Sequence, residues 1–222
     1  MIGVTDLHFR YPEGDFDLRI PRLAVGHGER VAVVGPSGSG KTTLLNLVAG
    51  ILLPEQGTVH CDGSEVSALS DAARRDFRIT RIGFVFQDFE LLGYLNVLDN
   101  VLHPYRISGA LKLTREIRER AGDLLQQMGL GDKLVRGVER LSQGEKQRVA
   151  ICRALLPSPQ LVLADEATGN LDPRNKGHIL DLLFDVVQAH ESTLLAVTHD
   201  HELLPRFDRT VDFNDFLDVD PA

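Results

Sequence analysis

The chain of 222 residues has no tryptophan and only two cysteines, Cys61 and Cys152. Because no CxxC pair is present, we expect neither a disulfide framework nor a structural zinc site. Long apolar runs are missing too. The longest nearly apolar run, from Leu44 to Leu53, is well short of the roughly 20 residues that a membrane-spanning helix needs. No basic start followed by an apolar core is present, so we expect no signal peptide.

Basic charge is also in short supply. The chain has 24 Lys and Arg against 32 Asp and Glu, a formal net charge of −8, which argues against general nucleic-acid binding. The distribution is uneven, because residues 71–153 carry +4 whereas residues 1–70 and 154–222 carry −3 and −9. The hydrophobic content of 43% is typical of a soluble globular protein. We therefore expect one compact domain, and the basic middle third indicates an inserted lobe.

Strand patterns alternate with helix patterns along the chain. Short apolar or β-branched runs predict strands at residues 4–10, 16–20, 30–34, 58–61, 82–86, 161–164, 193–198 and 210–213. Helices are predicted at residues 41–49, 145–156 and 173–190, and residues 88–135 are mostly helical in pattern. The alternation predicts a layered α/β domain. We expect a single domain over residues 1–222, with a helical subdomain inserted at about 88–158.

The strongest local signal is GPSGSGKT at residues 35–42, which fits GxxxxGK[ST] between a predicted strand and a predicted helix. Glycines let such a loop wrap closely around phosphate oxygens, and its N–H groups attract anions. Lys41 would reach the β and γ phosphates, the Thr42 hydroxyl would ligate Mg²⁺, and Thr43 would touch the α phosphate. A chance Gly-rich turn is the alternative, which the flanking elements disfavour. The predicted nucleotide contacts are Gly35, Pro36, Ser37, Gly38, Ser39, Gly40, Lys41, Thr42 and Thr43.

A second signal is LVLADE at residues 161–166. Its four apolar residues predict a central strand. Asp165 at the carboxyl end can hold Mg²⁺ through water, and Glu166 can polarise an attacking water. Taken alone, the pattern fits a buried strand with two surface acids about equally well. Beside a phosphate loop, the metal ligand and catalytic base are favoured.

A third signal is LSQGE at residues 141–145, which we call the signature segment. Ser142 and Glu145 have the spacing of a capping box at a helix start. A helix N-terminus preceded by Ser and Gly is also an anion site, so the structural and functional interpretations are compatible.

The signature segment is similar to the LSGGQ-type motif of the ATP-binding-cassette family. The phosphate loop, the LVLADE strand and VTHD at residues 197–200 follow that family's order, and the resemblance covers nearly the whole chain. It implies a phosphate-loop core with a mostly parallel sheet, an antiparallel β subdomain and an inserted α-helical subdomain. The implied activity is ATP hydrolysis with ATP and Mg²⁺. Gln143 replaces the commoner Gly, which should leave the γ-phosphate contact through Ser142 and Gly144 intact.

The resemblance also implies roles for single residues. Tyr11 matches the aromatic residue that stacks on adenine, although a strand-end aromatic that packs the core edge is the alternative. Gln87 matches the glutamine that touches Mg²⁺ and the attacking water. His199 matches a switch histidine on the γ phosphate, against the alternative of a structural histidine. Asp172, in NLD at residues 170–172, matches the loop that crosses to the second subunit and locally is a helix N-cap.

Partners follow from the same resemblance. Two subunits are expected to pair head to tail as a homodimer, with ATP between one phosphate loop and the other chain's Ser142, Gln143, Gly144 and Glu145. ATGNLD at residues 167–172 and FVFQDFELL at residues 84–92 resemble the branch serving lipoprotein release, macrolide or peptide export and cell division. There the ATPase works on a separate transmembrane permease that docks on the helical subdomain. The candidate contacts here are the exposed residues among Phe89, Leu91, Leu92, Tyr94 and Leu95, and the alternative is that these residues pack the lobe itself. The implied location is cytoplasmic, on the inner face of the cell membrane, with membrane contact only through the partner.

Two other classes stay open at this point. A cassette ATPase acting on nucleic acid or cluster assembly is the first, although such relatives usually carry coiled-coil or zinc insertions, or two cassettes. A phosphate-loop kinase is more remote, because it leaves the signature segment and His199 unexplained. The acidic stretch at residues 208–222, with five Asp and one Arg, fits a solvated tail better than a docking element.

Overall fold

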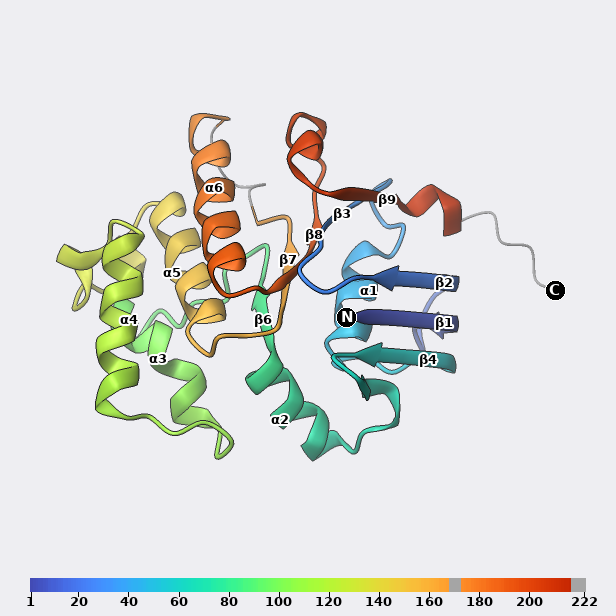
Figure 1. Ribbon diagram of the computed structural model, residues 1–222, viewed down its shortest axis with the longest axis horizontal. Coiled ribbons are helices and arrows are strands. Elements are labelled where there is room, and N and C mark those ends of the chain that lie inside the picture. Colours follow the sequence, from blue (N-terminus) through green and yellow to red (C-terminus); the bar gives the residue numbers. More distant parts are fainter. Residues whose placement is uncertain (168–172, 217–222) are drawn as a thin grey trace.

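A parallel sheet lies at the centre of the computed structural model, which describes residues 1–167 and 173–216 (Figure 1). Its strand order is β6-β7-β8-β3-β9, and all its pairings are parallel. Every residue of β7 and β8 is buried, which explains the apolar runs at residues 161–164 and 194–197. The strands are β3 (Arg30–Val34), β6 (Ile82–Val85), β7 (Leu161–Asp165), β8 (Thr193–Val197) and β9 (Arg209–Asp212).

A second, antiparallel sheet has the order β2-β1-β4-β5. Its strands are β1 (Ile2–Arg10), β2 (Asp17–Val25), β4 (Gln56–Cys61) and β5 (Ser64–Glu65). One face is buried, as Ile2, Val4, Leu7 and Phe9 of β1 show. The register shifts between Thr5 and His8, which keeps apolar residues on that face on both sides of the irregularity.

Helices occupy the rest of the chain. Helix α1 (Lys41–Val48) follows β3, and α2 (Asp71–Arg81) precedes β6. Helices α3 (Val97–Ile107), α4 (Arg115–Gln127) and α5 (Gln143–Leu155) lie together at the end of the molecule away from the antiparallel sheet, and α6 (Pro173–Ala189) lies beside them (Figure 1). Short 3₁₀ helices are formed by Val66–Ala68, Gly131–Lys133, Val138–Arg140, His201–Arg206 and Phe213–Phe216. Among the described helices, none has the length and apolar character to cross a bilayer.

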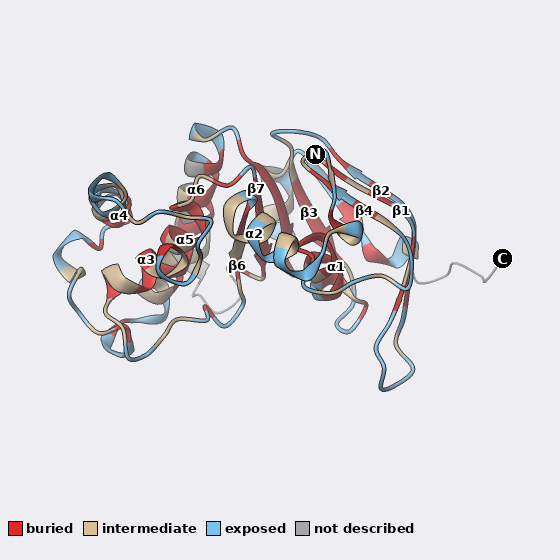
Figure 2. Ribbon diagram, turned by 90° about the horizontal axis from the view of Figure 1, so that it is seen from below, coloured by how far each residue is buried: buried red, intermediate tan, exposed pale blue. Residues whose placement is uncertain are grey.

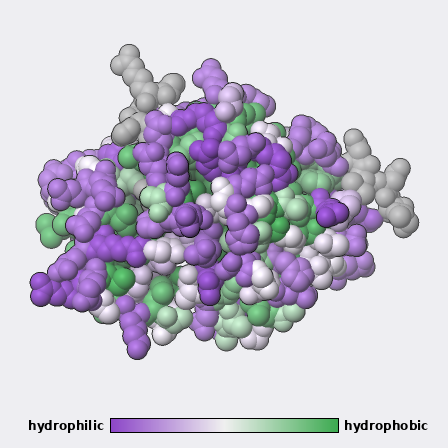
Figure 3. Space-filling model, in the orientation of Figure 1, coloured by the Kyte–Doolittle hydropathy of each residue, from purple (hydrophilic) through white to green (hydrophobic). Residues whose placement is uncertain are grey.

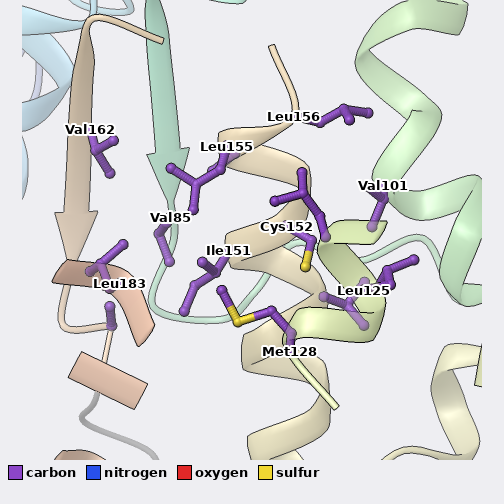
Figure 4. Packing of buried hydrophobic residues seen from close by; sticks show 14 of the residues in the cluster. Val85, Val101, Leu125, Met128, Ile151, Cys152, Leu155, Leu156, Val162 and Leu183 are labelled. Atoms are coloured by element: carbon purple, nitrogen blue, oxygen red, sulfur yellow. The ribbon is translucent and has the colours of Figure 1, made fainter. Parts of the chain in front are cut away.

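The buried residues form two clusters, and colouring by burial shows them concentrated on the central strands and the inner helix faces (Figure 2). In the first cluster, Ile151 and Leu155 of α5 face Val85 and Val162 of the sheet, while Val101 and Leu125 lie on the far side of α5 (Figure 4). Helix α5 therefore joins the helical lobe to the sheet. On the face drawn in Figure 3, hydrophilic side chains predominate and apolar surface is confined to small patches.

The predicted fold class is confirmed, with one parallel sheet, one antiparallel sheet and helices. The prediction for residues 88–135 is correct for α3 and α4, but residues 88–96 form turns, and Phe89 and Glu90 have positive φ angles. Helix α2 was not predicted, although Ser70 caps its first turn and its few apolar residues lie on one face. The predicted strand at 210–213 ends at Asp212, and Phe213 begins a 3₁₀ helix.

Candidate functional site

The phosphate loop connects β3 to α1, and its glycines occupy positions where a side chain would not fit. Gly35 has a φ of 148°, and a Cβ there would lie 2.7 Å from the Cβ of Phe213. Gly40 is the N-cap of α1 with a φ of 105°, and its Cβ would lie 2.8 Å from Cζ of Phe16. Gly40 has no side chain that could accept a hydrogen bond from the first N–H groups of α1. These N–H groups can therefore face an anion.

Lys41 is the first residue of α1 and is buried. Its Nζ donates to the carbonyl oxygens of Gly35 at 2.9 Å and Pro36 at 2.6 Å. Burial lowers the pKa of Lys41, whereas the nearby carboxylates of Glu166 and Asp165 raise it. The ammonium group is therefore held inside the loop by carbonyl groups, where phosphate oxygens can replace them.

Asp165 ends β7 and supplies a buried carboxylate beside the loop. Burial raises its pKa, and a hydrogen bond with the Thr42 hydroxyl opposes that shift. Within the described residues, Oδ1 of Asp165 is buried and has no hydrogen-bond partner. An orphaned carboxylate oxygen next to a hydroxyl is the hard oxygen donor set that Mg²⁺ prefers, so these residues fit the metal.

Glu166 lies between Gln87 and His199. Its φ of 46° is strained for a residue with a side chain, and its N–H donates to the Val197 carbonyl at 3.1 Å. Gln87 Nε2 donates to Glu166 Oε2 at 3.3 Å, and His199 Nε2 lies 2.6 Å from Oε1. Both carboxylate oxygens are therefore held by residues that follow the neighbouring strands β6 and β8.

One cavity of about 400 Å³ is lined by Lys41, Gln87, Glu166 and His199, together with Ser37, Gly38, Gly40, Thr42 and Thr43 of the phosphate loop. Tyr11 forms part of its wall, with its hydroxyl 3.1 Å from Thr43 Oγ1 and its ring 4.9 Å from that of Phe9. Tyr11 is thus both a cavity residue and a member of an aromatic cluster. Phe16, 5.5 Å from Tyr11, also lines the cavity. Phe16 was not among the predicted site residues, although an aromatic residue at the start of the strand predicted at residues 16–20, close to Tyr11, was a usable signal.

The signature segment forms the start of α5, and its capping box is confirmed. The Ser142 N–H donates to Glu145 Oε2 at 2.7 Å, and the Glu145 N–H donates to Ser142 Oγ at 3.4 Å. Ser142 and Gln143 are exposed. None of the described residues lining the cavity belongs to residues 142–145, so one chain keeps its phosphate loop and its signature segment apart. Asp172, also predicted to contact nucleotide, lies outside the described residues.

A second cavity of about 450 Å³ forms a groove between α2, β6, α3 and α5. Phe84, Phe86 and Ile107 supply apolar surface, and Arg78 and Arg153 supply charge. Of the predicted permease contacts, Tyr94 is 81% exposed, whereas Phe89 is buried. For Phe89 the alternative holds, namely that it packs the lobe itself, because its loop is folded inward.

The inward fold of this loop has a clear cause. Arg153 of α5 donates to the carbonyl groups of Phe89, at 2.6 Å, and Glu90. Leu91 packs against the same core cluster, and Leu92 and Leu95 are half-buried. Packing of the lobe therefore accounts for much of the apolar character of this segment.

The chain is similar to a known family model, to known proteins and to solved structures. A family model described as ABC transporter matches residues 18–169. The lipoprotein-releasing system ATP-binding protein LolD 2 of Rhodopseudomonas palustris is 39% identical over 99% of this chain and 95% of its own length. The macrolide export ATP-binding/permease protein MacB of Rhodopirellula baltica is 44% identical over 98% of this chain but only 32% of its own length. The dimeric structure of a post-hydrolysis ATP-binding cassette bound to ADP and Pi matches with a TM-score of 0.85 at 32% identity, over 96% of this chain and 94% of that one.

Proposed function

The chain belongs to the ABC transporter family as an ATP-hydrolysing subunit, and on this premise we propose that it drives a separate membrane permease in export, lipoprotein release or transmembrane mechanotransmission. The observation that carries the proposal is the cavity in which the phosphate loop meets Glu166 and His199, while the signature segment lies on another surface. Such a chain holds two half-sites. Each half-site is completed by a second copy.

The proposed dimer is head to tail and homomeric. ATP bound to one phosphate loop would contact the signature segment of the other chain through its γ phosphate. Hydrolysis removes this contact and favours opening. The matching cassette structure is itself described as dimeric, which supports this arrangement. We further propose that the whole chain is one cassette domain, with residues of about 88–158 as its helical subdomain.

We assign the chemistry to residues that already lie together. Tyr11 would stack on adenine, and Lys41 would exchange its carbonyl partners for phosphate oxygens. Thr42, Asp165 and Gln87 would hold Mg²⁺, which neutralises phosphate charge when bound. Glu166 would accept the proton of the attacking water. His199 would orient that carboxylate and contact the γ phosphate.

The permease would dock in the groove of Phe84, Phe86 and Ile107. Docking there would put the chain at the inner face of the cell membrane, with membrane contact through the partner alone. Ile107 is 66% exposed, so an apolar partner segment can cover it.

Ile107→Asp should abolish co-purification of a membrane protein from a detergent extract. Ile51→Asp, at an exposed residue outside the groove, should not. Equal recovery with both variants would contradict this docking site.

The ATPase assignment is tested with Glu166→Gln. The variant should bind ATP as tightly as the native chain and form an ATP-dependent dimer, because only the proton acceptor is changed. Its turnover should fall at least about a hundredfold, the range for loss of a general base. Light scattering after size-exclusion chromatography reports the dimer, and phosphate release reports turnover. Glu191→Gln, at an exposed acid, is the control. Native turnover by Glu166→Gln would refute the assignment.

A further inference from the structure

A lysine from another segment is bonded to the signature segment. Lys133, in the 3₁₀ helix Gly131–Lys133, places Nζ 2.6 Å from Oε1 of Glu145. The Lys133 and Glu145 side chains are only 22% and 16% exposed. The pair is therefore partly desolvated, unlike the many exposed ion pairs whose contribution is small.

Both oxygens of Glu145 are in use. Oε1 accepts from Lys133, while Oε2 accepts from the Ser142 N–H at 2.7 Å and from the Ser142 hydroxyl at 2.9 Å. Lys133 therefore fixes the end of the carboxylate that does not touch Ser142. With that end held, the other oxygen stays on Ser142 and determines where its hydroxyl points.

The charge of Glu145 matters because of where it lies. A carboxylate in the first turn of α5 already satisfies the positive end of the helix. A phosphate that approaches the same helix end meets this negative charge and is repelled. A glutamine could make the same bonds to Ser142 with no net charge. A glutamate needs a cation beside it, and Lys133 supplies one.

Protonation does not remove the charge. Bonds from Lys133 and Ser142 lower the pKa of Glu145 to about 2, so the carboxylate is ionised at neutral pH. Its charge can only be balanced by a neighbour.

We propose that Lys133 is a positioning residue for the contact between the signature segment and the γ phosphate of ATP on a second copy of the chain. By pairing with Glu145, it cancels that carboxylate's charge and holds it on Ser142. The inference rests on the proposed head-to-tail dimer. It adds a residue outside the signature segment to the determinants of ATP-driven closure.

The test uses the full chain in the Glu166→Gln background, where ATP-driven dimers accumulate. Lys133→Met should raise the ATP concentration for half-maximal dimer formation about tenfold, the order expected when a partly buried charge loses its partner. Lys133→Arg should retain dimer formation. Lys112→Met, at an exposed lysine of the same lobe, is the matched control. Binding of a fluorescent ATP analogue by the monomer should not respond to Lys133→Met, since that nucleotide lies on the phosphate loop.

A double-variant cycle separates positioning from general support of the lobe. In a Glu145→Gln background the carboxylate charge is gone, so adding Lys133→Met should change the half-maximal ATP concentration less than twofold. If Lys133→Met has no effect with Glu145 present, or an equal effect without it, the inference is overturned. If the parent Glu166→Gln chain forms no ATP-dependent dimer, the proposed dimer itself fails, and this outcome is recognised before any Lys133 variant is compared.

Discussion

Asn100 offers a sharp test of how the lobe is built, because this polar residue of α3 is completely buried. Its Oδ1 accepts from the Leu92 N–H at 2.8 Å. Its Nδ2 donates to the carbonyls of Leu92 at 3.1 Å, Leu95 at 3.3 Å and Asn96 at 3.0 Å. One amide therefore satisfies the backbone of the loop that leads from Gln87 into α3. Asn100→Leu keeps the approximate volume and removes every one of these bonds.

The expected cost follows from this bonding. Each neutral hydrogen bond contributes about 1 kcal/mol net, and a buried backbone group left without a partner costs about 1–3 kcal/mol. The carbonyl of Asn96 keeps a helical partner in the Asn100 N–H, so the main losses are the Leu92 groups and the Leu95 contact. The added apolar burial of leucine offsets part of this. We expect Asn100→Leu to lower the free energy of unfolding by about 3 kcal/mol.

Asn100→Asp keeps the acceptor for Leu92 but directs a carboxylate at carbonyl oxygens. Burial and these dipoles should raise the folded-state pKa of the new acid above its unfolded value of about 3.9. The protonated acid can still donate one bond. The contribution of this acid to the free energy of unfolding of Asn100→Asp is therefore greatest below about pH 4. It is lost as the pH rises towards the folded-state pKa, by up to about 1.4 kcal/mol per pH unit. The variant should be less stable than Asn100→Leu at pH 7 and closer to it at pH 4.

Urea unfolding followed by circular dichroism at both pH values measures these differences. Asn214→Leu, at an exposed residue, should stay within about 0.5 kcal/mol of the native chain. If Asn100→Leu also lies within that range, the amide does not organise the loop. If Asn100→Asp gains stability between pH 4 and pH 7 relative to the native chain, the reasoning about its surroundings is wrong.

Two further predictions concern the phosphate loop and the signature segment. Gly35→Ala should weaken binding of a fluorescent ATP analogue at least about tenfold, since its Cβ would lie 2.7 Å from that of Phe213; Gly122→Ala, with open space around its Cβ, should bind normally. Glu145 has its pKa lowered to about 2. Its stabilisation is therefore present above about pH 4.5 and lost as the pH falls towards 2. Solvent screening limits this contribution to about 1 kcal/mol. Between pH 4.5 and pH 2, Glu145→Gln should therefore lose about 1 kcal/mol less free energy of unfolding than the native chain. The pH at which acid unfolding begins should hardly change. An unchanged acid profile would refute the Glu145 prediction, as native ATP affinity of Gly35→Ala would refute the other.

Local sequence was sufficient to predict elements whose structure depends only on residues within one segment. The strand predicted at residues 30–34 has the same bounds as β3. Both faces of this strand are covered, so its apolar run coincides with the strand itself. The capping box needed only Ser142 and Glu145 and formed as predicted. The family order also identified an ATP-hydrolysing transporter subunit, which the relatives confirm over the nucleic-acid and cluster-assembly alternative.

Features that depend on tertiary contacts were beyond the sequence. The sequence left open whether Phe89 docks a partner or packs the lobe, and the inward position of its loop depends on Arg153, 64 residues later, which donates to its carbonyl. Lys133 is 12 residues from Glu145, and the two meet only because a short 3₁₀ helix packs beside the start of α5. Helix α2 is an exception, because the Ser70 N-cap and the apolar residues gathered on one face were local signals that the prediction overlooked.

The strand order explains why the proposed catalytic groups meet and how they connect to the groove. Strands β6, β7 and β8 are parallel neighbours, so the residues that follow them, Gln87, Glu166 and His199, must emerge at one edge. The helices α3, α4 and α5 are inserted between β6 and β7, and Gln87 is the second residue after β6 ends. One of the two chain connections between the lobe and the sheet therefore contains Gln87, whose Nε2 donates a hydrogen bond to the carboxylate of Glu166. Phe86 lines the groove and precedes Gln87, so a partner docked as proposed would be linked to Glu166 by two adjacent residues and one hydrogen bond.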